Sequence, residues 1–111
     1  MTEEYLAPGP TREEVDRISG AAVLEFGTDW CGYCRAAEVI VQQALAENPG
    51  ILHLKVEDGP GRRLGRSFKI KLWPTLIFLK DGKELARVVR PTGVDDLRRC
   101  MKVLLDASTS S

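Results

Sequence analysis

The 111-residue sequence has few of the residues that build disulfide scaffolds or metal centres. It contains three cysteines, an odd number and too few for a disulfide-rich fold. A closed zinc site needs four ligands, and beyond one close cysteine pair the chain offers only Cys100 and a single histidine, His53. An iron–sulfur cluster lacks ligands for the same reason, unless two chains share it. We therefore expect no metal site.

The sequence also lacks an excess of charge and long apolar runs. Its 16 basic and 16 acidic side chains give a formal net charge of zero, which provides no bulk attraction to nucleic acid or to an anionic membrane. No apolar stretch approaches the ~20 residues of a membrane span, and the N-terminus does not have the pattern of a secretory signal. We expect a cytoplasmic protein that binds neither nucleic acid nor membrane, although a mature secreted chain would also lack its signal.

Length and composition fit a single domain over residues 1–111, and we expect a monomer. Residues 1–10, rich in Pro and Gly, are expected to be an irregular lead-in, and residues 107–111 a flexible tail. Hydrophobic periodicity and turn residues predict the elements between them. In order, they are a helix from Thr11 to Gly20, a strand at 21–26, a helix from the first cysteines to Pro49, a strand at 51–57, a short helix within 58–71, strands at 75–80 and 83–89, and a helix at 94–105.

Two cysteines, Cys31 and Cys34, lie where the first strand gives way to a helix. If that helix begins near Cys31, its first N–H groups and its dipole point at the sulfur and favour the nucleophilic thiolate. We expect Cys31 to be exposed, and Gly32 beside it to leave room for a substrate backbone. Cys34 lies one turn further on the same face, where it can attack a mixed disulfide formed at Cys31. With metal ligands missing, this spacing favours a redox pair.

Two segments of the chain resemble the thioredoxin family. They are EFGTDWCGYC, which begins at Glu25, and WPTLIFLKDGKEL, which begins at Trp73. The resemblance extends from about residue 11 to 106 and implies an α/β thioredoxin fold, with three α/β/α layers and a central mixed sheet of about four strands carrying helices on both faces. It also implies a protein thiol–disulfide oxidoreductase that acts on protein disulfides without a bound cofactor. Electrons would come from a thioredoxin reductase or a small thiol.

The same resemblance assigns roles to individual residues. Cys31 matches the nucleophile, Cys34 the resolving cysteine and Trp30 an indole that packs beside the site. Pro74 matches a cis-proline whose ring lies against the disulfide. The residue before it, Trp73, would offer backbone groups that pair with a substrate as an added strand.

Glu25 is a charged residue inside the otherwise apolar run AAVLEF. Burying a carboxylate there is costly unless its proton exchange is useful. In the family an acidic residue at this place helps to move the proton of the buried cysteine, and Lys55 matches a lysine on the adjacent strand. We expect Glu25 to be a proton shuttle for Cys34 with Lys55 as its electrostatic partner. The alternative is that the longer glutamate side chain reaches solvent.

Several positions depart from the family pattern. Tyr33 stands where thioredoxins carry proline, at a position that contacts substrate and tunes the reduction potential. Gly27 and Trp73 replace a tryptophan and a small aliphatic residue. We expect Trp73 to refill part of the space at Gly27, to extend the substrate-docking surface, or simply to pack on the surface. Arg90 and Pro91 stand near a usual glycine, where they could narrow the docking groove or add a positive contact.

Other functions stay open at this point. Electrons could flow in the opposite direction, as in a disulfide oxidase or isomerase, or the groove could hold a partner without turnover, because fold does not fix function. Cys100 lies on or beside the apolar stripe of the last helix, which favours a buried, inert thiol over a regulatory or dimer-forming one.

Overall fold

A computed structural model describes residues 5–109 and contains every predicted element in the predicted order. The elements are α1 (Arg12–Asp16), β1 (Ala21–Gly27), α2 (Gly32–Ala46), β2 (Leu52–Glu57), α3 (Arg63–Ser67), β3 (Thr75–Lys80), β4 (Lys83–Val89) and α4 (Val94–Thr109). The last helix continues past Asp106 to Thr109, beyond the predicted end at residue 105. Residues 110–111 of the expected flexible tail lie outside the described part of the chain.

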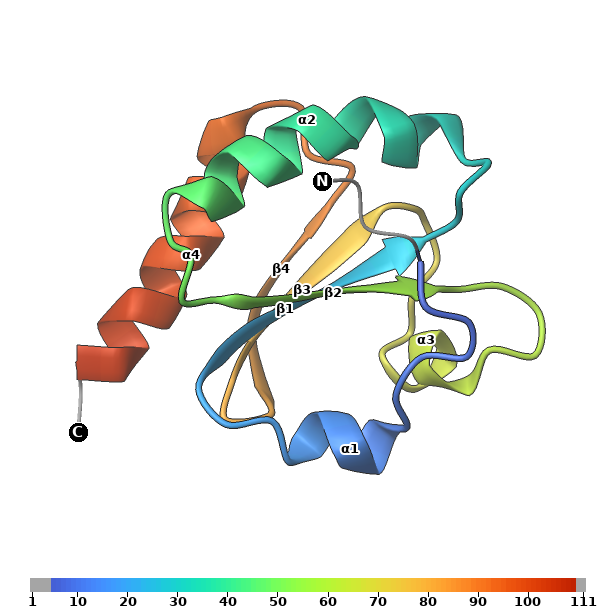
Figure 1. The fold of residues 1–111 in the computed structure, drawn as a ribbon, viewed down its shortest axis with the longest axis horizontal. Coiled ribbons are helices and arrows are strands. Elements are labelled where there is room, and N and C mark those ends of the chain that lie inside the picture. Colours follow the sequence, from blue (N-terminus) through green and yellow to red (C-terminus); the bar gives the residue numbers. More distant parts are fainter. Residues whose placement is uncertain (1–4, 110–111) are drawn as a thin grey trace.

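The four strands form one mixed sheet in the order β2-β1-β3-β4. β1 pairs in parallel with β2 and antiparallel with β3, which in turn pairs antiparallel with β4. Helices α2 and α4 cover one face of this sheet, and α1 and α3 cover the other (Figure 1). The predicted three-layer thioredoxin fold is therefore confirmed.

The central position of β1 explains its nearly continuous apolar sequence. Successive side chains of a strand point to opposite faces. Val23 accordingly belongs to the core cluster beneath α2 and α4, whereas Leu24 and Phe26 belong to the cluster on the side of α1 and α3. The same alternation places Glu25 with Val23, on the face that α2 covers.

Residues 5–10 form no strand or helix, but one of them, Leu6, pairs with the edge of the sheet. Leu6 forms a parallel bridge with Val56, donating its N–H to the Lys55 carbonyl (2.8 Å) and accepting from the Glu57 N–H (3.0 Å). The outer edge of β2 carries backbone groups that need partners, and this segment supplies them. Residues 1–4 of the expected lead-in lie outside the described residues.

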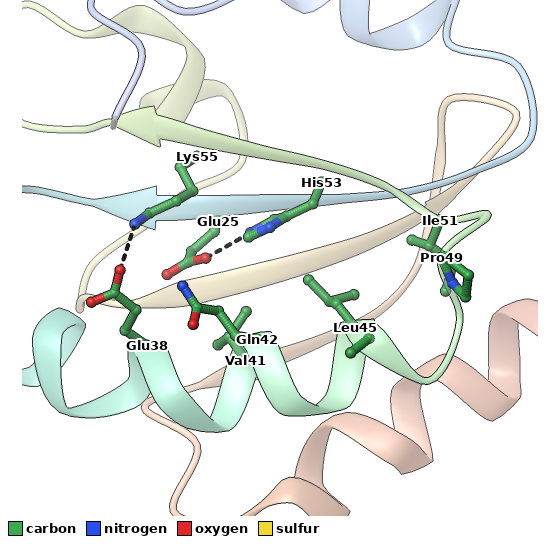
Figure 2. A pocket seen from close by; sticks show the side chains of 10 residues that line it. Glu25, Glu38, Val41, Gln42, Leu45, Pro49, Ile51, His53 and Lys55 are labelled. Atoms are coloured by element: carbon green, nitrogen blue, oxygen red, sulfur yellow. Dashed lines mark hydrogen bonds and ion pairs between the residues drawn. The ribbon is translucent and has the colours of Figure 1, made fainter. Parts of the chain in front are cut away.

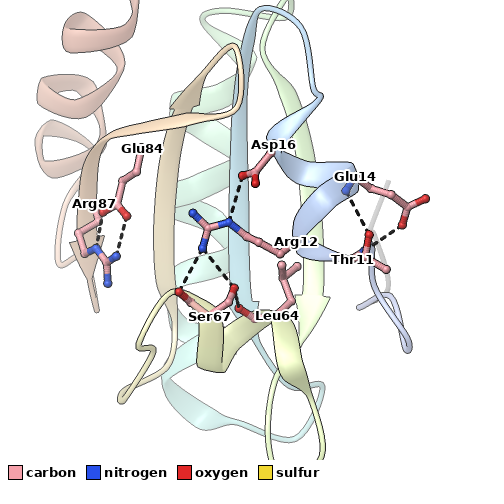
Figure 3. Close-up of polar contacts among 8 residues, drawn as sticks. All are labelled: Thr11, Arg12, Glu14, Asp16, Leu64, Ser67, Glu84 and Arg87. Carbon is pink, nitrogen blue, oxygen red and sulfur yellow. Dashed lines mark hydrogen bonds and ion pairs between the residues drawn. The ribbon is translucent and has the colours of Figure 1, made fainter.

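Helix α1 begins at the predicted capping box. Glu14 N–H donates to Thr11 Oγ1 (3.1 Å), and the Thr11 N–H donates to Glu14 Oε1 (2.9 Å) (Figure 3). Arg12 then links α1 to α3 through the Ser67 carbonyl (3.1 Å) and pairs with Asp16 (3.1 Å).

Among the described residues, no helix is long and apolar enough to cross a membrane.

The turn between β3 and β4 depends on a glycine. Asp81 and Gly82 both have positive φ (51° and 80°), the conformation of the predicted Asp-Gly hairpin. A Cβ on Gly82 would overlap the backbone carbonyl of Asp16, so the hairpin packs directly against α1.

We expect Gly82→Ala to destabilise the fold by about 1–3 kcal/mol, because it combines left-handed strain with a backbone clash. Gly50→Ala is the matched control, since a Cβ there meets no atom within 4 Å. Urea unfolding of both variants and the wild type measures the difference. Equal free energies of unfolding for the two variants would contradict this account of the turn.

Candidate active site

The two paired cysteines lie at the N-terminus of α2. Cys31 is the N-cap residue, and its Sγ accepts a hydrogen bond from the Cys34 N–H (3.3 Å). Both are free thiols, with relative exposures of 7% and 3%. The expectation that Cys31 is exposed was wrong, because the sulfur turns inward to cap the Cys34 N–H in the first turn of the helix.

Cys34 is enclosed by Gly27 and by Tyr5 from the N-terminal segment. A Cβ on Gly27 would overlap the Cys34 sulfur and come within 2.8 Å of the Tyr5 hydroxyl, so only glycine lets these two groups meet beside β1. Burial and, after it, the neighbouring Cys31 sulfur raise the pKa of Cys34, whose net value is about 11. Hydrogen bonds from the Thr28 backbone and the Tyr5 hydroxyl oppose this rise in pKa. Cys34 is therefore a thiol at neutral pH and must lose a proton before it can act as a nucleophile.

Glu25 is buried behind the cysteines. Its relative exposure is 1%, so the alternative that its side chain reaches solvent was wrong. Oε1 lies 2.7 Å from His53 Nε2, and Oε2 accepts from the Tyr5 hydroxyl at 3.4 Å. Burial, then the charges of Glu25 and Cys34, raise the pKa of Tyr5 well above its usual value, so Tyr5 stays a neutral hydroxyl.

A cavity of about 350 Å³, lined by polar and apolar side chains, leads from Glu25 toward solvent between β2 and α2 (Figure 2). His53 and Lys55 reach into it from β2, and Glu38 from α2. Lys55 lies opposite Glu25 in the strand register, forms an ion pair with Glu38 (3.8 Å) and carries its ammonium 4.5 Å from the centre of the Tyr5 ring.

Trp73 and Trp30 form an aromatic pair at the mouth of the site. Their ring centroids are 5.7 Å apart with an edge-on geometry, and Trp73 Nε1 donates to Asp58 Oδ2 (2.9 Å). The expectation that Trp73 refills the space at Gly27 was wrong, because the atoms nearest to that glycine belong to Cys34 and Tyr5. Trp30 is 74% exposed and is available to contact a partner.

Arg90 lies beside the Trp73–Pro74 step and contacts Tyr33. The Trp73–Pro74 peptide bond is cis, as the resemblance implied. Arg90 Nε donates to the Trp73 carbonyl (2.8 Å), and its guanidinium lies 3.8 Å from the centre of the exposed Tyr33 ring. The backbone acceptor expected to pair with a substrate therefore already has a donor.

The structure thus places Cys31 beside Cys34 and connects Cys34 to Glu25 through Tyr5. Tyr5 and His53 are two residues near Glu25 that sequence reasoning missed. The sequence presents His53 only as a candidate metal ligand, although its spacing from Lys55 places both on one face of β2. Tyr5 had no signal of this kind, because nothing in the expected lead-in indicated pairing with β2. Within residues 5–109, no three His, Cys, Asp or Glu side chains gather in a way that could hold a metal ion.

Comparison with known proteins identifies the family. Residues 6–103 match the family model described as Thioredoxin. The chain belongs to the thioredoxin family.

Similar thioredoxins cover most of the chain. Thioredoxin from Chlamydia trachomatis is 34% identical over 79 residues, which are 71% of this chain and 78% of that protein. An H-type thioredoxin from Picea mariana is 33% identical over 100 residues, 90% of this chain and 78% of that protein. The reduced structure of thioredoxin 2 from Pseudomonas aeruginosa superposes with a TM-score of 0.86 at 51% identity, covering 96% of this chain and 99% of that one.

Membership in the thioredoxin family makes this chain a protein thiol–disulfide oxidoreductase. Proteins of the family generally act on protein disulfides together with thioredoxin reductase.

We expect the reduced protein to lose stability as the pH rises from about 9 to about 11. Folding raises the pKa of Cys34 from 9.0 to about 11, so the folded state keeps a proton that the unfolded state releases in this range. The stabilisation is complete below the unfolded pKa and is lost as the pH passes the folded pKa. Urea unfolding of reduced wild type and Cys34→Ser across this range measures the effect.

The free energy of unfolding should fall less with rising pH in Cys34→Ser than in the wild type. Tyr5, whose pKa is also raised, contributes a loss in the same direction to both proteins, so their difference isolates Cys34. Parallel declines in the two proteins would contradict the raised pKa.

Proposed function

We propose that this protein reduces disulfides in other proteins, with Cys31 as the nucleophile and Cys34 as the resolving thiol. The observation that carries the proposal is the pair of free cysteines at the N-terminus of α2, one capping the helix and the other backed by the buried carboxylate of Glu25. The N-terminal N–H groups and dipole of α2 favour a thiolate at Cys31.

The reaction has two steps. The Cys31 thiolate attacks a substrate disulfide, forming a mixed disulfide and releasing one substrate sulfur as a thiolate. Cys34 then loses its proton and attacks Cys31 Sγ, which forms the Cys31–Cys34 disulfide and releases the second substrate sulfur. Two electrons pass from the cysteine pair to the substrate disulfide.

Glu25 is the acceptor for the Cys34 proton in this proposal. It lies on the face of β1 covered by α2, and the Tyr5 hydroxyl is close to both Glu25 and Cys34. Lys55 contributes positive charge on the neighbouring strand, in register with Glu25.

Substrate docks on the surface around Trp30, Gly32, Tyr33 and the Trp73–Pro74 step. Trp30 and Tyr33 are 74% and 60% exposed, and a side chain on Gly32 would meet no atom within 4 Å, so the surface beside Cys31 has room for a substrate backbone. An incoming strand that pairs with the Trp73 carbonyl must share or displace the Arg90 guanidinium. A thioredoxin reductase in the cytoplasm would return electrons to the oxidised pair.

We expect Cys31→Ser to reduce insulin disulfides with dithiothreitol no faster than the uncatalysed reaction, because the nucleophile is gone. Cys34→Ser should instead accumulate a covalent mixed disulfide that non-reducing electrophoresis detects. Cys100→Ala is the control and should keep wild-type activity, since Cys100 lies in the core cluster beneath α2 and α4. Wild-type activity in Cys31→Ser would overturn this mechanism.

The reduction potential of the pair decides the direction of electron flow. We expect equilibration with glutathione buffers to give a potential near ~−270 mV, the value of a reducing thioredoxin. A potential above ~−200 mV would instead assign the protein to disulfide oxidation or isomerisation.

A further inference from the structure

The buried Glu25 carboxylate has hydrogen-bonding partners on two sides. The Tyr5 hydroxyl donates to Oε2, on the side of Cys34, and His53 Nε2 lies 2.7 Å from Oε1, on the side of the cavity. Figure 2 shows the imidazole and the carboxylate facing each other at the wall of this cavity. The side chain of Glu25 is 2% exposed and that of His53 is 20% exposed, so His53 is the better placed of the two to reach water.

A proton that arrives on Glu25 is therefore enclosed unless a neighbour removes it. The bond between Glu25 and His53 can hold the proton at either end, because the ring nitrogen donates to a carboxylate and accepts from a carboxylic acid. A carboxyl proton that faces Nε2 can therefore pass to the imidazole, which then releases the proton on Nδ1. The walls of the cavity carry Lys55 and Glu38, and polar surroundings of this kind suit ordered water.

We propose that His53 is the group that transfers the proton from Glu25 to solvent, and that the Tyr5 hydroxyl connects Glu25 to Cys34. This inference rests on the proposed function, because it concerns the step in which Cys34 resolves the mixed disulfide. Neither residue contacts substrate in this scheme. Tyr5 exchanges a proton with Cys34 directly, whereas His53 is a positioning residue that acts through Glu25.

The proton path balances with the electron path. Cys34 gives its proton to Tyr5 Oη while the Tyr5 proton passes to Glu25 Oε2, so Tyr5 remains neutral. The Cys34 thiolate attacks Cys31 Sγ, and the substrate sulfur leaves as a thiolate with the electron pair of the broken bond. The Glu25 carboxyl group then turns about its last bond so that this proton faces His53 Nε2, which accepts it, and the imidazole releases its Nδ1 proton to water in the cavity.

The geometry also accounts for Gly27. The Cys34 sulfur and the Tyr5 hydroxyl both occupy the space that a side chain at residue 27 would fill. The bridge through Leu6 to β2 holds Tyr5 at this position, and the Lys55 ammonium lies over its ring. Tyr5 and His53, from distant parts of the chain, are thus both brought to the Glu25 carboxylate.

Ellman's reagent separates the two chemical steps. The attack of Cys31 releases one nitrothiobenzoate anion, and the attack of Cys34 on the mixed disulfide releases a second, so stopped-flow absorbance gives a rate for each. Every protein carries Cys100→Ala, so that only the active-site pair reacts. The variants are His53→Gln, His53→Ala and Tyr5→Phe, and Gln42→Ala is the control because Gln42 lines the same cavity with a group that does not titrate.

We expect His53→Gln and Tyr5→Phe to slow the second release by about tenfold or more, since proton transfer by a positioned group contributes on the order of 100-fold or more. The first release should stay within about twofold of wild type in every variant, and Gln42→Ala should match wild type in both steps. Added imidazole should restore the second release in His53→Ala, because it can occupy the vacated space and carry the proton.

A second release at the wild-type rate in His53→Gln would overturn the role of His53. So would a slow His53→Ala that imidazole does not restore, since that result indicates a structural role. If Tyr5→Phe gives the second release at the wild-type rate, Tyr5 does not take part in the proton transfer. Failure of the proposed function is distinguishable, because wild type itself would then show no second release or Cys34→Ser would show both.

Discussion

A carboxylate with 1% exposure in the central strand of a sheet has to obtain from the protein the solvation that it loses from water. The effective cost of burying such a charge is several kcal/mol. A hydrogen bond to a charged group contributes about 1.5–3 kcal/mol, so a single partner does not offset the burial of Glu25. The fold provides partners from two separate segments, the N-terminal segment through Tyr5 and β2 through His53. The arrangement of both segments around the site follows from this requirement.

The requirement also links the edge of the sheet to the chemistry at its centre. β2 is an edge strand, and the pairing of Leu6 with Val56 covers part of that edge. The same pairing delivers the Tyr5 hydroxyl to the space above Gly27, against the sulfur of Cys34. A larger residue at position 27 would exclude Tyr5, and a free N-terminal segment would leave Glu25 with fewer donors. Gly27 and the N-terminal segment therefore depend on each other to place Tyr5 beside Cys34, although they lie far apart in the sequence.

Most of the fold could be predicted because its signals are local. The continuous apolar run of β1, the capping box at Thr11 and the Asp81-Gly82 turn each specify their own element, and the cysteine pair marks the start of α2. The surroundings of Glu25 could not be predicted in the same way, because they depend on strand register and on an edge pairing between distant segments. Periodicity placed a histidine and a lysine on β2 but did not say which of them would reach the carboxylate.

The residues at the mouth of the site that differ from the family pattern, Trp73, Arg90 and Tyr33, contact one another or a common neighbour. Trp73 is large enough to contact Trp30 and to reach Asp58, which fixes the indole at the rim of the groove. Arg90, with a φ of 50°, turns back to the Trp73 carbonyl and covers the face of Tyr33. A substrate strand thus meets a surface in which the central backbone acceptor is already bonded and a cation lies beside an exposed ring. Because breaking that bond is part of docking, substrates that offer Arg90 a new acceptor, such as a carboxylate near their disulfide, lose less free energy on binding than substrates that do not.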